Sequence, residues 1–136
     1  MALFYADASA LVKLVHHEPE TAALGTYLAG ADIISSELAL TEVPRAVLRA
    51  AADDPALPLD ALMARADDVL QALALLPIDR ALLLAAGALA EPSLRALDAI
   101  HIASAVAVLP IDAFVTYDDR QGAAARLAGL RTVAPA

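Results

Sequence analysis

The stretch Leu3–Val12, LFYADASALV, decides the fold class of this chain. Its first four residues form a short apolar run, which predicts a buried strand over Leu3–Ala6. Asp7 follows at the end of that run, and the apolar spacing after it predicts a helix over Ala8–His17. A strand that leads directly into a helix is the repeating unit of parallel sheets, so this segment predicts an α/β fold.

The same alternation of strand and helix continues along the chain. Further strands are predicted over Ile33–Ile34, Leu75–Ile78, Asp112–Thr116 and Leu130–Val133. Further helices are predicted from Glu18–Glu20 to Gly30, over Glu37–Ala51 and Leu59–Ala74, from Asp79 or Arg80 to Ala90, and over Asp98–Leu109 and Asp119–Ala128. Within the third helix, Pro44 predicts either a kink or a restart with Thr41 as the cap. We expect a three-layer α/β/α sandwich with a central, mostly parallel sheet, in one domain over residues 1–136.

Composition narrows the possible functions. The 136 residues are 60% hydrophobic, carry a net charge of −8 and include no cysteine, which excludes disulfides, thiolate metal sites and cysteine nucleophiles. The longest uncharged stretch, Ala99–Ile111, is shorter than the ~20 residues of a membrane span, and no signal peptide is recognisable, so we expect a cytoplasmic protein. The negative charge argues against a nonspecific nucleic-acid binder but suits an acidic metal site or a basic protein partner.

Four acidic residues stand beside apolar runs at predicted strand ends or within predicted helices. Carboxylates gathered at the carboxyl ends of parallel strands bind hard cations such as Mg²⁺, and such cations commonly act on phosphates. Two hydroxyl side chains, Ser9 and Thr116, lie close enough in sequence to support such a site. The candidate ligands are Asp7, Glu42, Asp98 and Asp118.

Two of these acids also have a simple structural explanation at the start of a helix. Asp7 and Asp98 each precede or open a predicted helix, where aspartate serves as an N-cap or interacts favourably with the helix dipole. His101 follows Asp98 by three residues and lies near the same helix face. It either orients a carboxylate or is a hydrogen-bonded core histidine, which is the more common role.

The other two acids are open to similar alternatives. Glu42 is either held by a partner or is a solvated glutamate at the rim of its helix, paired with Arg45. Asp118 precedes Gln121 by three residues, the spacing of a capping box, and Asp119 is an adjacent competitor for any metal. Each acid alone is therefore weak evidence, and the argument for a site depends on all four.

Five segments in this order resemble the PIN-domain family, in particular the VapC-like toxins of bacterial toxin–antitoxin modules. The resemblance covers nearly the whole chain, and the order and spacing of the segments are more specific than any one of them. The segments are Tyr5–Leu14 (YADASALVKL), Ser36–Val43 (SELALTEV), Leu94–Ala105 (LRALDAIHIASA), Ala113–Asp118 (AFVTYD) and Ala124–Leu130 (AARLAGL).

The resemblance implies a Mg²⁺- or Mn²⁺-dependent endoribonuclease that cuts single-stranded or loop RNA. A cognate VapB-like antitoxin would neutralise it, and VapC-like proteins commonly pair as homodimers. The family's acidic quartet falls on the four acids named above, with Thr116 at the position of a hydroxyl that often lines such sites. The chain departs from the family at Asp119, where a basic residue is common. Candidate RNA contacts are Lys13, Arg45, Arg49, Arg95 and Arg120.

Two phosphotransfer families with strand-end aspartates lack matching residues in this chain. A haloacid-dehalogenase-like phosphatase needs a second aspartate two residues after Asp7, where this chain has Ser9. A response-regulator receiver needs a lysine after a late strand, and this chain has no lysine beyond Lys13. The remaining alternatives are a catalytically silent PIN-like domain that only binds a partner, and a PIN-type nuclease in RNA processing that has no antitoxin.

Overall fold

The computed structural model describes all residues from Met1 to Ala136. The five strands are β1 (Leu3–Ala6), β2 (Asp32–Ser36), β3 (Ala74–Leu76), β4 (Ala113–Val115) and β5 (Thr132–Val133). The seven helices are α1 (Ala8–Val15), α2 (Thr21–Leu28), α3 (Ala39–Asp53), α4 (Leu59–Gln71), α5 (Arg80–Gly87), α6 (Ala96–Ala107) and α7 (Asp119–Leu127). None of the helices is both long and apolar enough to cross a bilayer.

The strands form one sheet in the order β3-β2-β1-β4-β5, and every neighbouring pair is parallel. The first strand of the chain lies at the centre, where Tyr5 pairs with Ile34 on one side and Phe114 on the other. The predicted α/β class is therefore confirmed, and the sheet is wholly rather than mostly parallel.

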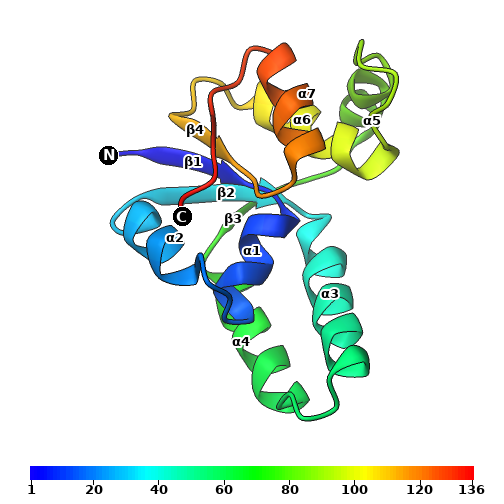
Figure 1. Cartoon of the computed structure of the whole chain (residues 1–136). Coiled ribbons are helices and arrows are strands. Elements are labelled where there is room, and N and C mark those ends of the chain that lie inside the picture. Colours follow the sequence, from blue (N-terminus) through cyan, green and yellow to red (C-terminus); the bar gives the residue numbers. More distant parts are fainter.

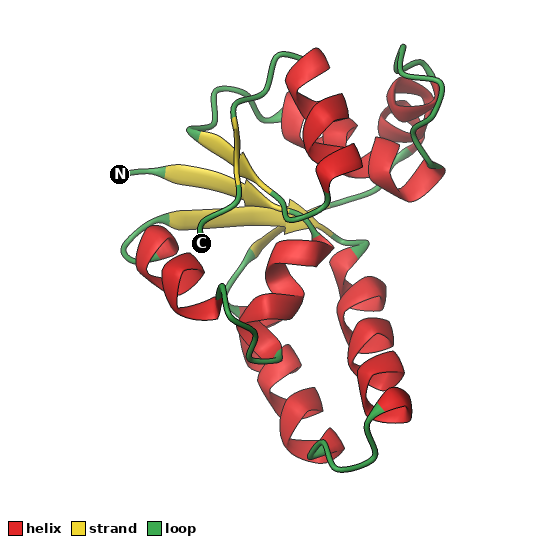
Figure 2. Ribbon diagram, in the orientation of Figure 1, coloured by secondary structure: helices red, strands yellow, loops and turns green.

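Helices cover both faces of the sheet. Figure 1 shows α1, α2, α3 and α4 on one face and α5, α6 and α7 on the other, and Figure 2 shows the strands as a layer between them. Successive side chains of β1 point to opposite faces, so Phe4 and Ala6 join the core beneath α1–α4, whereas Tyr5 joins the core beneath α6 and α7. The three predicted layers are present.

The chain leaves the two central strands in opposite directions. β1 leads into α1 on one face, and its neighbour β4 leads into α7 on the other face. At such a switch point the two connections separate and leave a crevice beyond the carboxyl ends of the strands. Asp7 follows β1 directly, and Asp118 lies three residues after the end of β4. The topology therefore brings two of the predicted acids to one crevice.

Some predicted boundaries are wrong. α2 begins at Thr21, because the threonine hydroxyl accepts a hydrogen bond from the Glu18 backbone N–H at 2.9 Å and donates to the Lys13 carbonyl at 2.7 Å, which holds the preceding residues in a turn. α3 continues through Pro44, so the helix does not restart at Thr41. The missing proline N–H there leaves only one carbonyl of the first turns without its helical donor.

Candidate acidic active site

Asp7 is a buried carboxylate without a cationic side chain to pair with. It caps α1, with Oδ1 accepting hydrogen bonds from Ser9 Oγ at 2.6 Å and from the Ala10 backbone N–H at 3.1 Å. Its Oδ2 accepts from Thr116 Oγ1 at 2.6 Å, and the residue is only 3% exposed. Burial raises the pKa of this carboxyl above its ordinary value, and the hydrogen bonds oppose that shift only in part. The capping role is confirmed, but it does not neutralise the charge.

Two hydroxyl groups connect Asp7 to the far side of the crevice. Ser9 Oγ accepts a hydrogen bond from the Tyr117 backbone N–H at 2.9 Å and lies 3.3 Å from Thr116 Oγ1. Thr116 Oγ1 in turn accepts from the Asp118 backbone N–H at 3.1 Å. The start of α1 and the turn before α7 are therefore joined through side chains, which fixes the backbone of Asp118 relative to Asp7.

Glu42 is held by a buried chain of hydrogen bonds. Its Oε1 lies 2.6 Å from His101 Nε2, and His101 Nδ1 lies 2.8 Å from the Tyr5 hydroxyl. An ionised Glu42 can only accept a hydrogen bond, so Nε2 carries a proton. In the neutral ring Nδ1 then accepts a hydrogen bond from the Tyr5 hydroxyl. Burial raises the pKa of Tyr5, which keeps its hydroxyl protonated.

This chain of contacts settles two alternatives left open by the sequence. His101 is both a buried core histidine and the residue that orients a carboxylate. Glu42 is not a solvated glutamate paired with Arg45, because its side chain is 20% exposed and its only ion-pair partner is His101. Sequence reasoning missed Tyr5, which is 96 residues from His101 and stands in an apolar strand without any signal of its role.

Asp98 lies on α6, and its carboxyl is affected by the charges of the other three acids. It is the third residue of α6, and Arg95 occupies the cap position, so the prediction that Asp98 opens the helix is wrong by two residues. Burial raises its pKa, and the negative charges of Asp118, Asp7 and Glu42 raise it further, against the opposing effect of His101. All three other carboxylates are therefore near enough to act on Asp98.

The negative charge of Asp118 raises the pKa of Asp98. Asp118 caps α7 by accepting a hydrogen bond from the Gln121 backbone N–H at 3.0 Å. The reciprocal half of the capping box is not formed, because the Gln121 side chain is buried and its Oε1 has no partner. Asp119 is exposed beside Asp118, and which of the two faces a metal stays a prediction in favour of Asp118.

The donor chemistry suits Mg²⁺ or Mn²⁺. As the side chains stand, no three acidic or histidine groups are arranged to hold one ion between them. Mg²⁺, however, binds through one or two carboxylates, keeps several water molecules and uses substrate phosphates as further ligands. A buried carboxylate without a cationic partner, such as that of Asp7, gains from a cation at this place. Convergence of all four acids on one ion remains a prediction.

Known proteins resemble this chain over almost its full length. The family model of the PIN domain matches residues 4–127. Ribonuclease VapC46 of Mycobacterium tuberculosis is 38% identical over 143 residues, covering 99% of this chain and 99% of the relative. Ribonuclease VapC35 of the same species is 37% identical over 140 residues, covering 98% and 97%.

Solved structures share the fold at low sequence identity. PAE2754 from Pyrobaculum aerophilum has a TM-score of 0.67 and 21% identity over 97% of this chain and 84% of its own. VapBC2 from Rickettsia felis, bound to a DNA fragment from its promoter, has a TM-score of 0.69 and 15% identity, covering 98% and 99%. With the family match and relatives above 30% identity over nearly every residue, this chain belongs to the PIN-domain family.

Proposed function

We propose that this chain is a metal-dependent endoribonuclease, the toxin of a bacterial type II toxin–antitoxin module, which hydrolyses single-stranded or loop RNA. The observation that carries the proposal is the buried Asp7 carboxylate, which has no cationic partner at the switch point of the sheet and is joined through the Thr116 hydroxyl to the backbone of Asp118. The relatives named ribonuclease VapC, which align over the whole chain, support the same reaction.

The side chains divide into ligands and supports. Asp7, Asp98 and Asp118 would hold the divalent ion, and Glu42 would complete the set, kept in place by His101. A bound Mg²⁺ or Mn²⁺ supplies Lewis-acid activation of a water molecule and stabilises charge on the phosphodiester. The water oxygen forms a bond to phosphorus, the bond to the leaving ribose oxygen breaks, and the proton released by the water ends on that oxygen. No side chain is required as a covalent nucleophile.

Ser9 and Thr116 support this reaction indirectly. Their hydroxyl groups donate hydrogen bonds to the two oxygens of Asp7. These bonds fix the orientation of the carboxylate and therefore the direction of its remaining lone pairs. Preorganised ligands of this kind lower the cost of placing the ion when substrate arrives. Substitution of either residue is expected to reduce the free energy of metal binding by more than it reduces the free energy of unfolding.

A basic antitoxin would account for the net charge of −8. The related VapBC2 structure pairs two proteins, and we propose a VapB-like partner for this chain. An arginine of that partner would pair with the crevice carboxylates and compete with the divalent ion.

We further propose a homodimer, because the chain exposes large apolar side chains on α5 and α7, including Leu83, Leu84 and Leu127. A monomeric mass by light scattering at micromolar concentration would contradict it.

The reaction is tested with purified protein and a mixed-sequence single-stranded RNA. Cleavage should require Mg²⁺ or Mn²⁺ and stop in excess chelator. Asp7→Asn should abolish cleavage and weaken Mn²⁺ binding measured by calorimetry, whereas the exposed neighbour Asp119→Asn should leave both nearly unchanged. Undiminished cleavage in chelator would refute the metal mechanism. Metal binding without cleavage of any RNA would favour a silent partner-binding domain.

The toxin assignment has a separate test in cells. Expression of the unmodified chain should arrest growth and fragment RNA, and Asp7→Asn should do neither. Co-expression of the product of the neighbouring gene should restore growth and yield a stable complex. A nuclease that is active in vitro but has no neutralising neighbour would instead belong to RNA processing.

A further inference from the structure

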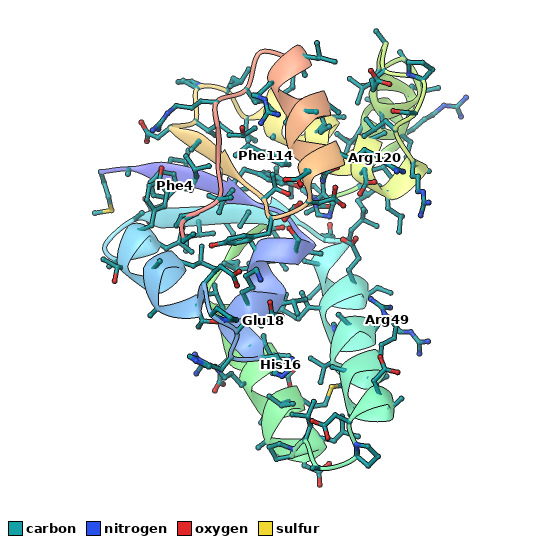
Figure 3. The ribbon with its side chains drawn as sticks, viewed as in Figure 1. Phe4, His16, Glu18, Arg49, Phe114 and Arg120 are labelled. Atoms are coloured by element: carbon teal, nitrogen blue, oxygen red, sulfur yellow. The ribbon has the colours of Figure 1, made fainter.

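A groove of about 550 Å³ runs from the acidic crevice along the facing sides of α1 and α3. Ser9 and Glu42 line it where it meets the candidate site, and Arg45 and Arg49 line it further along α3. Figure 3 shows Arg49 on α3 and Glu18 on the segment after α1, two residues that line this groove. The groove therefore connects the acids to a pair of cationic side chains.

The three cations in the groove are not equivalent. Lys13 forms ion pairs with Glu18 and with Glu20, the latter at 3.0 Å, and its ammonium group lies 4.7 Å from the centre of the Tyr117 ring. Its charge is therefore already neutralised inside the protein. Arg45 and Arg49 form no ion pair and no hydrogen bond within the chain, although acidic residues outnumber basic ones by 17 to nine. These are the free positive charges of the groove.

The spacing of the two arginines suits a chain of anions. Arg45 and Arg49 follow Glu42 by three and seven residues, so all three lie on one face of α3. Four residues of α-helix separate the Cα atoms of the two arginines by about 6 Å along the axis. A guanidinium group binds phosphate through paired N–H donors and stays charged at any physiological pH. Successive phosphates leaving the acidic site would meet first one arginine and then the other.

The other walls of the groove favour RNA over an acidic peptide. Leu97, which is 50% exposed, and the half-buried Tyr117 offer apolar surface on which a base can rest. An acidic peptide lying on the arginines would bring its carboxylates towards Glu42 without a cation between them. An RNA strand that also contacts a metal at the crevice has its charge balanced at both places.

We propose that Arg45 and Arg49 form a phosphate-binding subsite that positions the RNA strand on one side of the scissile bond. This inference rests on the ribonuclease function proposed above. The subsite adds affinity and register for a single strand and carries no base specificity of its own, because phosphate contacts are the same for every sequence.

The test measures RNA binding separately from cleavage. In an Asp7→Asn background with Mg²⁺, binding of a fluorescent single-stranded RNA is followed by anisotropy over a range of salt concentrations. Arg45→Ala and Arg49→Ala should each weaken binding about fivefold and lower the slope of log affinity against log salt by about 0.7. Arg45→Lys should keep the slope but lose part of the affinity. In the active protein the alanine substitutions should raise KM more than they lower kcat.

Arg80→Ala is the matched control, since Arg80 is exposed on α5, has no ion pair and lies outside the groove. The inference is wrong if the groove variants bind RNA with the affinity and salt slope of the Arg80 variant. It is also wrong if the groove variants bind the antitoxin more weakly but bind RNA as before, which would make the groove a protein interface. Failure of the Asp7→Asn parent to bind RNA, together with no cleavage by the unmodified chain, would overturn the proposed function as well.

Discussion

Replacing Tyr5 by phenylalanine removes one buried hydroxyl group and tests whether the contacts behind Glu42 hold it in place. The tyrosine is fully buried, and its ring stacks on Phe114 with centroids 5.2 Å apart and planes 6° apart. Phenylalanine keeps that stacking, so the packing cost is small. The hydroxyl contact of 2.8 Å to His101 Nδ1 is lost, and no other side chain forms a hydrogen bond to that nitrogen.

The expected loss follows from the group left behind. A buried acceptor without a partner costs about 1–3 kcal/mol, so the free energy of unfolding should fall by about 2 kcal/mol. For a chain of this length that corresponds to a decrease in Tm of several degrees. Urea unfolding in chelator measures this loss without any contribution from bound metal. Since His101 then holds Glu42 less firmly, Mn²⁺ affinity measured by calorimetry should also fall, by about threefold to tenfold.

Tyr27→Phe provides the matched control. Tyr27 stacks on Phe4 at a centroid distance of 4.7 Å, and its hydroxyl makes no hydrogen bond in the chain, so stability should change by less than about 0.5 kcal/mol. If Tyr5→Phe were as stable as this control, the hydroxyl would not be the proton donor to His101. If stability fell but Mn²⁺ affinity stayed the same, the buried contacts would serve the fold alone.

Further predictions concern the acids and the helices. Asp7→Asn should raise the Tm of the metal-free protein at neutral pH, and this gain should shrink towards pH ~4. The reason is the raised pKa of the Asp7 carboxyl in the folded state: its effect favours folding fully below the unfolded pKa and is lost as pH rises through the folded pKa. A pH-independent gain would contradict this reasoning. Mn²⁺ affinity should fall on acidification at a pH above the ordinary carboxyl range, because the pKa values of Asp7 and Asp98 are both raised; calorimetry across pH checks it. Gly25→Ala should stabilise α2 by about 0.5–1 kcal/mol in urea unfolding, since the added methyl group meets no atom within 4 Å.

Local patterns in the sequence predict the order of the elements, because short apolar runs and helical spacing depend on neighbouring residues alone. The boundaries that were missed depend on distant or turn contacts. The residues Glu18–Glu20 carry a proline in a good position to begin a helix, yet Lys13 draws both glutamates into ion pairs and Thr21 ties the turn back to α1. Such competition between local preference and side-chain contacts is invisible in a residue pattern.

The shared crevice of Asp7 and Asp118 was predictable because a parallel sheet places the ends of its strands together, whereas a site made of all four acids stays a prediction. The support for those acids was not predictable in the same way. Ser9 receives the Tyr117 N–H from 108 residues away, and the path from Glu42 through His101 ends on a tyrosine of the first strand. The sequence offered Ser9, Thr116 and His101 as possible supports, but only the geometry shows which atoms they hold and that His101 is both buried and bound to Glu42.

The pairing of the first strand with β4 also determines when activity can begin during synthesis. β1 is made first, but its neighbour β4 emerges from the ribosome more than a hundred residues later, since Phe4 pairs with Ala113. Long-range pairing of this kind cannot form until both segments are available. Asp7 meets Thr116 only at that stage, so a nascent chain that stops before β4 can pair β1 with β2 but has no crevice between β1 and β4. A ribonuclease built in this order cannot cut the transcript that encodes it until translation is almost complete.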